Sequence, residues 1–166
     1  MQPGAPWPKF SNNVSNTGVG VGSGSNGLVR WSIPFSVYAP VVAADGTIYT
    51  TDQTGVRALN PDGTTKWYGG SAFPVSGTGL TIGYDGTLYV PDTSISGNCN
   101  LVAMNPSGTT LWSFAEPGAT FTSPTIGADN SVYVGSTDPN SKTFLGTMYG
   151  VSSGGALNGV SRREGR

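Results

Sequence analysis

Apolar and polar positions alternate along this chain in short runs, and residues that favour turns separate one run from the next. Apolar residues do not keep the spacing of an amphipathic helix over about a dozen positions without a Gly or Pro interrupting them. Short runs rich in Val, Ile, Leu and aromatic residues, bounded by turn dipeptides, are typical of strands. The pattern therefore predicts an all-β protein.

One pattern of runs and turns occurs three times. Each copy begins with an apolar run, passes through an Asp-Gly or Asp-Asn turn and ends in Tyr, and the copies are Pro40–Tyr49, Leu80–Tyr89 and Pro124–Tyr133. The first two continue to Ala58–Trp67 and Ala103–Trp112, where an Asn-Pro-x-Gly turn precedes the Trp. A repeat of about 40 residues that consists of strands and turns is typical of a β-propeller blade.

Each unit contains four strand candidates. They lie at 39–43, 47–51, 55–60 and 64–68 in the first unit, at 79–84, 87–91, 100–105 and 109–114 in the second, and at 123–128, 131–135, 146–151 and, more weakly, 156–160 in the third. A further run over 28–33 carries Trp31 and matches the last strand of a unit. A single blade cannot bury both of its faces, so neighbouring blades must stack. We therefore predict a partial β-propeller of about three four-stranded antiparallel blades.

Turn residues and tryptophans recur at matching positions of the units. These structural repeat positions are the turn residues Asp45, Gly46, Gly63, Asp85, Gly86, Gly108 and Asp129 and the tryptophans Trp31, Trp67 and Trp112. The Asp-Gly pairs tolerate the positive φ that tight hairpins require, and Asn130 after Asp129 does so with somewhat more strain. Pro61 and Pro106 fix φ in the second kind of turn, which a Gly closes. We interpret the tryptophans as packing residues between neighbouring blades.

The repeats divide the chain into three parts. We predict an irregular N-terminal segment at 1–27, the repeats at 28–158 with units at about 28–68, 69–114 and 115–158, and a disordered tail at 159–166. The third unit departs from the pattern, since alignment places Asn158 where the other units have Trp. The sequence from Val160 onward resembles no strand of the repeat.

Charge and hydropathy exclude two classes of partner. Charged residues make up 10% of the sequence and the formal net charge is −1, so we see no clustered basic surface of the kind that nucleic-acid binding needs. Arg162, Arg163 and Arg166 are grouped near the end of the sequence, and we interpret them as a solvated tail. No apolar run approaches the roughly 20 residues of a membrane span. The sequence starts in polar residues and shows no signal peptide.

Residues that could perform catalysis are few. The sequence contains no His, the usual general base near neutral pH and the commonest metal ligand. Cys99 is the only cysteine, so it cannot form an intramolecular disulfide, and we interpret it as an unreactive thiol. Asp45, Asp62, Asp85 and Asp129 lie in turns, where their side chains bond nearby backbone N–H groups. They lack the dense spacing of a calcium loop, and we predict no catalytic and no metal site.

The repeat resembles a known family. The pattern Pro-Thr-Ile-Gly-x-Asp-Gly-Thr-Leu-Tyr-Val, followed by Ala-Leu/Met-Asn-Pro-x-Gly-Thr-Thr-x-Trp, resembles the PQQ-like (pyrroloquinoline quinone) β-propeller repeat over roughly 28–158, with a weaker match at 7–18. Such repeats occur in quinoprotein dehydrogenases and in non-enzymatic relatives such as the outer-membrane assembly lipoprotein. The resemblance implies rings of about six to eight blades and an exported protein: periplasmic, cell-surface or extracellular.

The enzymatic branch of this family implies residues that the chain lacks. It binds PQQ with a vicinal pair of cysteines, a stacking Trp and a calcium ion, and Cys99 alone cannot provide the pair. We therefore expect no cofactor. The Asp box of sialidase-type propellers is also absent, because Gly63 follows Asp62 directly instead of one residue later.

Three functions follow from these observations. The sequence favours a non-enzymatic propeller module that acts as a scaffold or protein-binding surface, whose partners are other proteins or copies of itself that close the ring. In the second case the run around Trp31 would complete the third blade of a neighbouring copy. One alternative is a fragment of a PQQ-dependent quinoprotein dehydrogenase. The other is a carbohydrate-binding surface with exposed aromatic residues at Tyr38, Tyr68, Phe73 and Tyr84.

Overall fold

The protein folds into three antiparallel β-sheets, as a computed structural model shows. The structure describes residues 28–34, 37–52, 54–69, 78–93, 98–117, 120–137 and 146–162. No helix occurs within these ranges. The prediction of an all-β protein with successive antiparallel four-stranded units is therefore confirmed, with one extra short strand in the third sheet.

Each sheet is built from strands that are consecutive in sequence and pair in chain order. Sheet A contains β1 (Tyr38–Val42), β2 (Ile48–Thr51), β3 (Val56–Leu59) and β4 (Thr65–Gly69). Sheet B contains β5 (Thr81–Ile82), β6 (Leu88–Thr93), β7 (Asn98–Met104) and β8 (Thr110–Pro117). Sheet C contains β10 (Thr125–Ile126), β11 (Val132–Thr137), β12 (Gly146–Val151) and β13 (Leu157–Arg162), and β9 (Thr120–Phe121) also pairs with β11.

Six tight turns of the same conformation join strands within the sheets. They span 43–47, 60–64, 83–87, 105–109, 127–131 and 152–156. In each turn the first residue donates its N–H to the carbonyl of the fifth and accepts the N–H of the fourth. The fourth residue has positive φ, from 64° at Asn130 to 88° at Gly108, which is a type I turn followed by a bulge. Thus only the second residue of each Asp-Gly pair needs positive φ, and the Asp serves the turn through its side chain.

The last strand of sheet C extends further than the sequence predicts. Strand β13 continues to Arg162, beyond the expected end of the repeats at 158 and into the segment expected to be a disordered tail. It pairs with β12 over its whole length through backbone hydrogen bonds. Such pairing does not depend on apolar side chains, so the polar residues Ser161 and Arg162 gave no signal that the strand continues beyond 160. Arg163 and Arg166 lie outside the described residues.

Pairing register also corrects the alignment of the third unit. In sheet B, Ala103 pairs with Trp112, and the equivalent pair in sheet C is Gly150 with Gly159. The repeat Trp is therefore replaced by Gly159 and not by Asn158. The alignment was wrong by one residue because the β12–β13 turn contains two consecutive glycines, and the second of them takes the positive φ.

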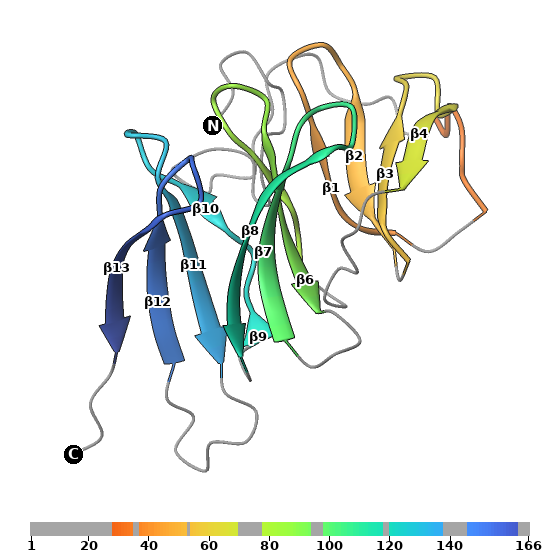
Figure 1. Cartoon of the computed structure of the whole chain (residues 1–166). Helices are drawn as coiled ribbons and strands as arrows, with labels where there is room; N and C mark the ends of the chain where they lie inside the picture. Colours follow the sequence, from red (N-terminus) through yellow and green to blue (C-terminus); the bar gives the residue numbers. More distant parts are fainter. Residues whose placement is uncertain are drawn as a thin grey trace.

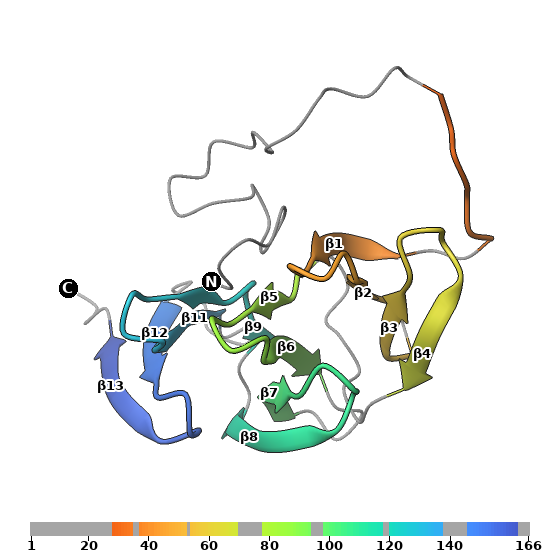
Figure 2. The same cartoon turned by 90° about the horizontal axis from the view of Figure 1, so that it is seen from above.

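The three sheets stand next to one another and fan out from the side that carries β1 and β5, with β4, β8 and β13 on the outer side (Figure 2). All six tight turns lie at one end of the molecule, which we call the turn end, and the C-terminal ends of β2, β6 and β11 lie at the opposite end, the loop end (Figure 1). Each sheet has an N-side face, turned toward the preceding sheet, and a C-side face, turned toward the following sheet. Side chains alternate between these faces along every strand.

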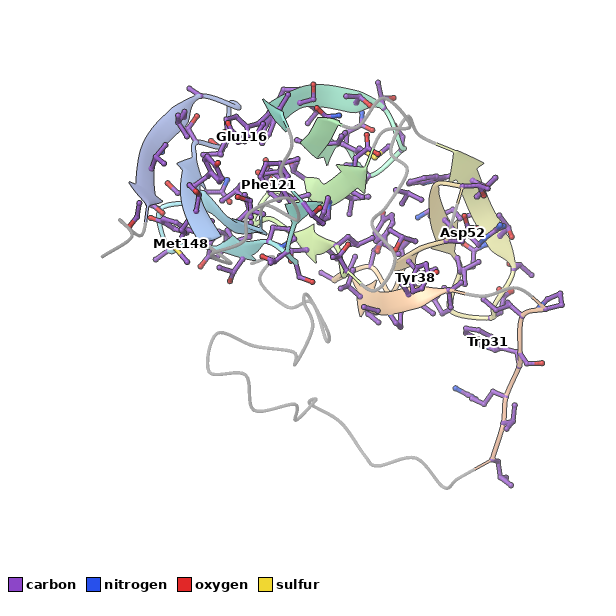
Figure 3. All side chains as sticks on the ribbon, turned by 90° about the horizontal axis from the view of Figure 1, so that it is seen from below. Trp31, Tyr38, Asp52, Glu116, Phe121 and Met148 are labelled. Atoms are coloured by element: carbon purple, nitrogen blue, oxygen red, sulfur yellow. The ribbon has the colours of Figure 1, made fainter. Side chains whose placement is uncertain are left out.

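Two hydrophobic cores fill the spaces between the sheets. Between sheets A and B, the buried residues are Val41, Ala43, Tyr49, Val56, Ala58, Leu80, Ile82, Leu88, Val90, Val102 and Met104, and Trp67 packs against them. Between sheets B and C, they are Tyr89, Leu101, Ala103, Phe121, Ile126, Val132, Val134, Tyr149 and Val151, with Trp112 and Phe114 against them. Phe121 of β9 occupies the middle of the second core (Figure 3). Burial of these side chains between sheets, and not within one sheet, is what holds the fold together.

Candidate functional site

The repeat tryptophans on β4 and β8 make the same contact with the following sheet. Trp67 donates its indole N–H to the carbonyl oxygen of Pro106 at 2.9 Å, and Trp112 donates to the carbonyl oxygen of Ser153 at 2.7 Å. Each ring also lies on the left-handed glycine of that turn, since a Cβ added to Gly108 would be 3.0 Å from the Trp67 ring. The turn therefore needs glycine both for its φ angle and for the close approach of the indole.

Trp31 makes this contact with sheet A although it does not belong to a described strand. Its indole N–H donates to the carbonyl oxygen of Pro61 at 3.0 Å, and a Cβ added to Gly63 would lie 2.5 Å from its ring. Val29 in the same segment is 84% exposed, and Trp31 itself is 37% exposed. Sheet A therefore carries, on the turn at its N-side face, the indole that a preceding sheet would supply.

A tyrosine of the same sheet packs against each indole that lies between sheets. The ring centroids of Tyr49 and Trp67 are 6.0 Å apart, and those of Tyr89 and Trp112 are 5.8 Å apart. Burial raises the pKa of Tyr89 to about 12, and the nearby Asp85 carboxylate adds to this rise. A phenol with so high a pKa stays protonated near neutral pH, so the pair provides packing and not a reactive group.

The turn carboxylates form hydrogen bonds within their own turns. Each accepts the backbone N–H two residues later, at 2.9 Å for Asp45, 3.0 Å for Asp62, 3.1 Å for Asp85 and 3.1 Å for Asp129. The hydrogen bond from the Thr47 N–H is the main cause that lowers the pKa of Asp45, and burial acts in the opposite direction and raises this pKa. Each of the four turns contains one such carboxylate, so the carboxylates are not gathered in one place. Within the described residues, no group of three Cys, Asp or Glu side chains could hold a metal ion.

A buried carboxylate at the loop end of sheet A organises a small polar cluster. Asp52 accepts hydrogen bonds from the N–H and hydroxyl of Thr54, both at 2.8 Å, and from the N–H of Gly55 at 3.0 Å. It also forms an ion pair with Arg57 at 3.1 Å. The guanidinium of Arg57 lies 4.2 Å above the ring of Tyr68, whose hydroxyl bonds to Thr54. Burial raises the pKa of Asp52, but these hydrogen bonds and the Arg57 charge outweigh it and lower the net pKa.

The sequence analysis did not single out this carboxylate. Asp52 follows Tyr49 by three residues, and Asp92 follows Tyr89 by the same number. Ser136 takes the equivalent place in sheet C, and all three are buried, at 8%, 4% and 6% exposure. Aligning the three repeats on their Tyr residues would have identified these positions. A polar residue recurs at each of them, although the alternation of apolar and polar residues predicts a buried position there.

The C-side face of sheet C carries an open groove. It has a volume of about 350 Å³ and is bordered by Tyr133, Met148, Gly150 and Gly159, together with their neighbours on β13. Tyr133 is 39% exposed and Met148 is 56% exposed. The groove exists because Gly159 has no side chain where the other two sheets have an indole.

The aromatic residues considered for carbohydrate binding do not form one site. Tyr68 lies toward the loop end on β4, whereas Tyr84 lies in a tight turn at the turn end. Tyr38 is only half-exposed at the start of β1. Phe73 lies outside the described residues, and so does the side chain of Cys99.

No family model matches the chain, and no curated protein matches it either. Within the described residues, no helix is both long enough and apolar enough to cross a membrane.

Proposed function

We propose that this chain is a PQQ-like repeat propeller module that acts as a non-enzymatic, exported scaffold with a protein-binding surface. One observation carries the proposal: the residues that recur in the repeat are used to hold the sheets together. The indoles of Trp67 and Trp112 donate to turn carbonyls, and the turn carboxylates accept backbone N–H groups. Groups engaged in this way are not available as a general base, a nucleophile or a cofactor platform.

The loop end is the surface that we assign to recognition. At the turn end all six connections have the same length and conformation. The connections between the second and third strands of the three four-stranded units, 52–55, 94–97 and 138–145, have four, four and eight residues and differ in sequence. Binding residues typically lie on connections that a rigid scaffold positions, and variation confined to one end marks that end as the binding surface.

The described part of the loop end contains an anchor suited to a protein partner. Tyr68 is 45% exposed, and its position is fixed by Arg57 and Thr54. Tyr and Arg side chains contribute a large share of the binding energy at protein interfaces, and a side chain held in place before binding loses little entropy. We therefore expect Tyr68 and Arg57 to contact acidic or aromatic groups of the partner.

Affinity capture followed by reconstitution tests this surface. Proteins captured from the source extract are purified and titrated calorimetrically against the wild type and against Tyr68→Ala. We expect affinity for the genuine partner to fall at least about tenfold, since one anchor contributes more than about 1.4 kcal/mol. Leu111→Ala, which changes an exposed residue of β8, is the matched control and keeps the affinity. Equal affinity of all three proteins would remove the loop end from the proposal.

A dye-reduction assay with PQQ and Ca²⁺ separates this function from the dehydrogenase alternative. We expect the purified chain to reduce no dye with alcohols or sugars as substrates. PQQ-dependent turnover would overturn the non-enzymatic function. A glycan array serves the carbohydrate alternative, and we expect no binding above that of an unrelated β-protein.

A further inference from the structure

The two contacts between neighbouring sheets are built from the same three parts. The C-side face of one sheet supplies an indole and a tyrosine that packs on it, and the N-side face of the next sheet supplies a turn with a carbonyl acceptor and a glycine. The outer faces of sheets A and C are not used in either contact. Each of them carries parts of a third contact of this kind.

The C-side face of sheet C has the tyrosine but not the indole. Tyr133 is 39% exposed, whereas the equivalent Tyr49 and Tyr89 are 2% and 0% exposed. At the indole position, a Cβ added to Gly159 would meet no atom within 4 Å. Met148 is 56% exposed where Leu101 of sheet B is fully buried. This face is therefore an apolar surface with a groove at the place of one missing side chain.

The N-side face of sheet A has the turn and also an indole. Trp31 already donates to Pro61 and lies on Gly63. Its other side is not covered by a tyrosine, and it remains 37% exposed. Trp31 and Met148 lie at opposite ends of the row of sheets (Figure 3). One molecule therefore presents the groove at one end and the side chain that fits it at the other.

We propose that a second copy of this chain covers the C-side face of sheet C, and that its Trp31 fills the groove over Gly159 and packs on Tyr133. The contact is head-to-tail, so each copy uses both of its outer faces. Propellers have about four to eight blades, and six is the only multiple of three in that range, so two copies close the ring. The inference rests on the propeller arrangement of the proposed function but not on any loop-end ligand.

Light scattering on the purified chain measures the first consequence. We expect twice the chain mass of 17.0 kDa, with dissociation on dilution. Trp31→Ala and Gly159→Trp should each give the monomer, the first because the groove stays empty and the second because two indoles compete for one place. Val29→Ala, an exposed change in the segment of Trp31, is the control and keeps the dimer. A monomeric wild type, or a larger open-ended assembly, would overturn the proposal.

The double variant Trp31→Ala/Gly159→Trp distinguishes this contact from any other apolar association. Here the indole comes from β13, as it comes from β4 and β8 in the contacts within the chain. We expect the dimer to return, because the new indole can donate to the partner's Pro61 and lie on the partner's Gly63. Circular dichroism of all variants checks that the sheets are intact. A double variant that stays monomeric while folded would show that the groove does not take an indole. If a monomeric variant still binds a loop-end partner with unchanged affinity, the proposed function does not depend on the dimer and is tested separately from it.

Discussion

Sheet B and sheet C are built from the same repeat, but sheet B is covered on both faces whereas the C-side face of sheet C is open. Leu101 and Met148 hold the same position in the two sheets, and they are 0% and 56% exposed. Trp112 and Gly159 likewise occupy one register position. The four consecutive strands pair in the same order and the tight turns have the same hydrogen bonds in both sheets, so neither feature requires another sheet on the C-side face. The comparison shows that the repeat specifies each sheet, and that side chains at a few positions decide whether another sheet can follow.

The largest expected effect comes from truncating the two equivalent residues in separate variants. Leu101→Ala removes a fully buried side chain from the second core, and we expect it to lower the free energy of unfolding by about 2–5 kcal/mol. Met148→Ala should cost less than about 1 kcal/mol, because more than half of the Met148 side chain is already exposed to water and little buried apolar surface is lost. Urea denaturation at low protein concentration measures both, since a second copy that covers Met148 would add its own contribution. Equal losses would mean that the two faces are covered alike.

Much of the fold is predictable because it follows from local chemistry. The alternation of apolar residues gives the strands, and the Asp-Gly and Pro-x-Gly pairs give the turns, each within a few residues of sequence. The strand β13 was predicted only weakly and too short, because it contains a glycine and three polar residues and its pairing is through the backbone. A glycine pair in the preceding turn then shifted the alignment, so the missing Trp was assigned to Asn158 instead of Gly159.

The contacts between sheets are less predictable than the sheets. That Trp67 packs between sheets follows from its size, but the acceptor Pro106 lies 39 residues away and belongs to another unit. Asp52 was not identified as important because its ion-pair partner Arg57 comes near it only when β2 and β3 pair. Sequence alone thus indicates which residues recur, and the structure shows which of them meet.

The N-side face of sheet A offers a second comparison, because the charged Arg57 stands where the equivalent faces of sheets B and C have apolar residues. Arg57 aligns with Val102 and Tyr149 in the register of the three sheets, and Asp52 holds it. Asp52→Asn removes the negative charge that pairs with Arg57, so we expect a loss of about 1–3 kcal/mol at pH 7.

The pH dependence of this loss follows from the lowered pKa of Asp52. Because the pKa of the folded state lies below the ordinary value of 3.8, the carboxylate stabilises the fold fully above the unfolded pKa. This stabilisation is lost as the pH falls through the folded pKa. The difference between wild type and Asp52→Asn should therefore be constant from about pH 5 to 7 and shrink below about pH 4, as urea denaturation at several pH values measures. A difference that grows toward acid pH would contradict this assignment.

A smaller effect isolates the hydrogen bond of the indole from its packing. Trp67→Phe keeps an aromatic ring on Tyr49 but removes the N–H that donates to Pro106, and we expect a loss of about 1 kcal/mol. Trp31→Phe removes a hydrogen bond of similar length, but no described strand depends on it, so the monomer should lose less than about half as much. Thermal and urea unfolding of both variants give the two values. A larger loss at Trp31 would place the 28–34 segment inside the cooperative fold.

The smallest effect concerns the one tight turn that uses a residue other than glycine at its left-handed position. Asn130 has a φ of 64°, where sheet B has Gly86 at 87°. Asn130→Gly relieves a left-handed conformation that disfavours side chains, but the new glycine loses more backbone freedom on folding. It also removes the acceptor of a long, 3.4 Å hydrogen bond from Tyr84. The net change should be a gain in the free energy of unfolding of no more than about 0.5 kcal/mol.

Asn130→Ala keeps the left-handed conformation but lacks the local hydrogen bonding of Asn, so we expect the free energy of unfolding to fall by about 1 kcal/mol. Unfolding curves that rank Ala at or above Gly would show that this turn of sheet C is not under the same backbone constraint as its counterpart in sheet B.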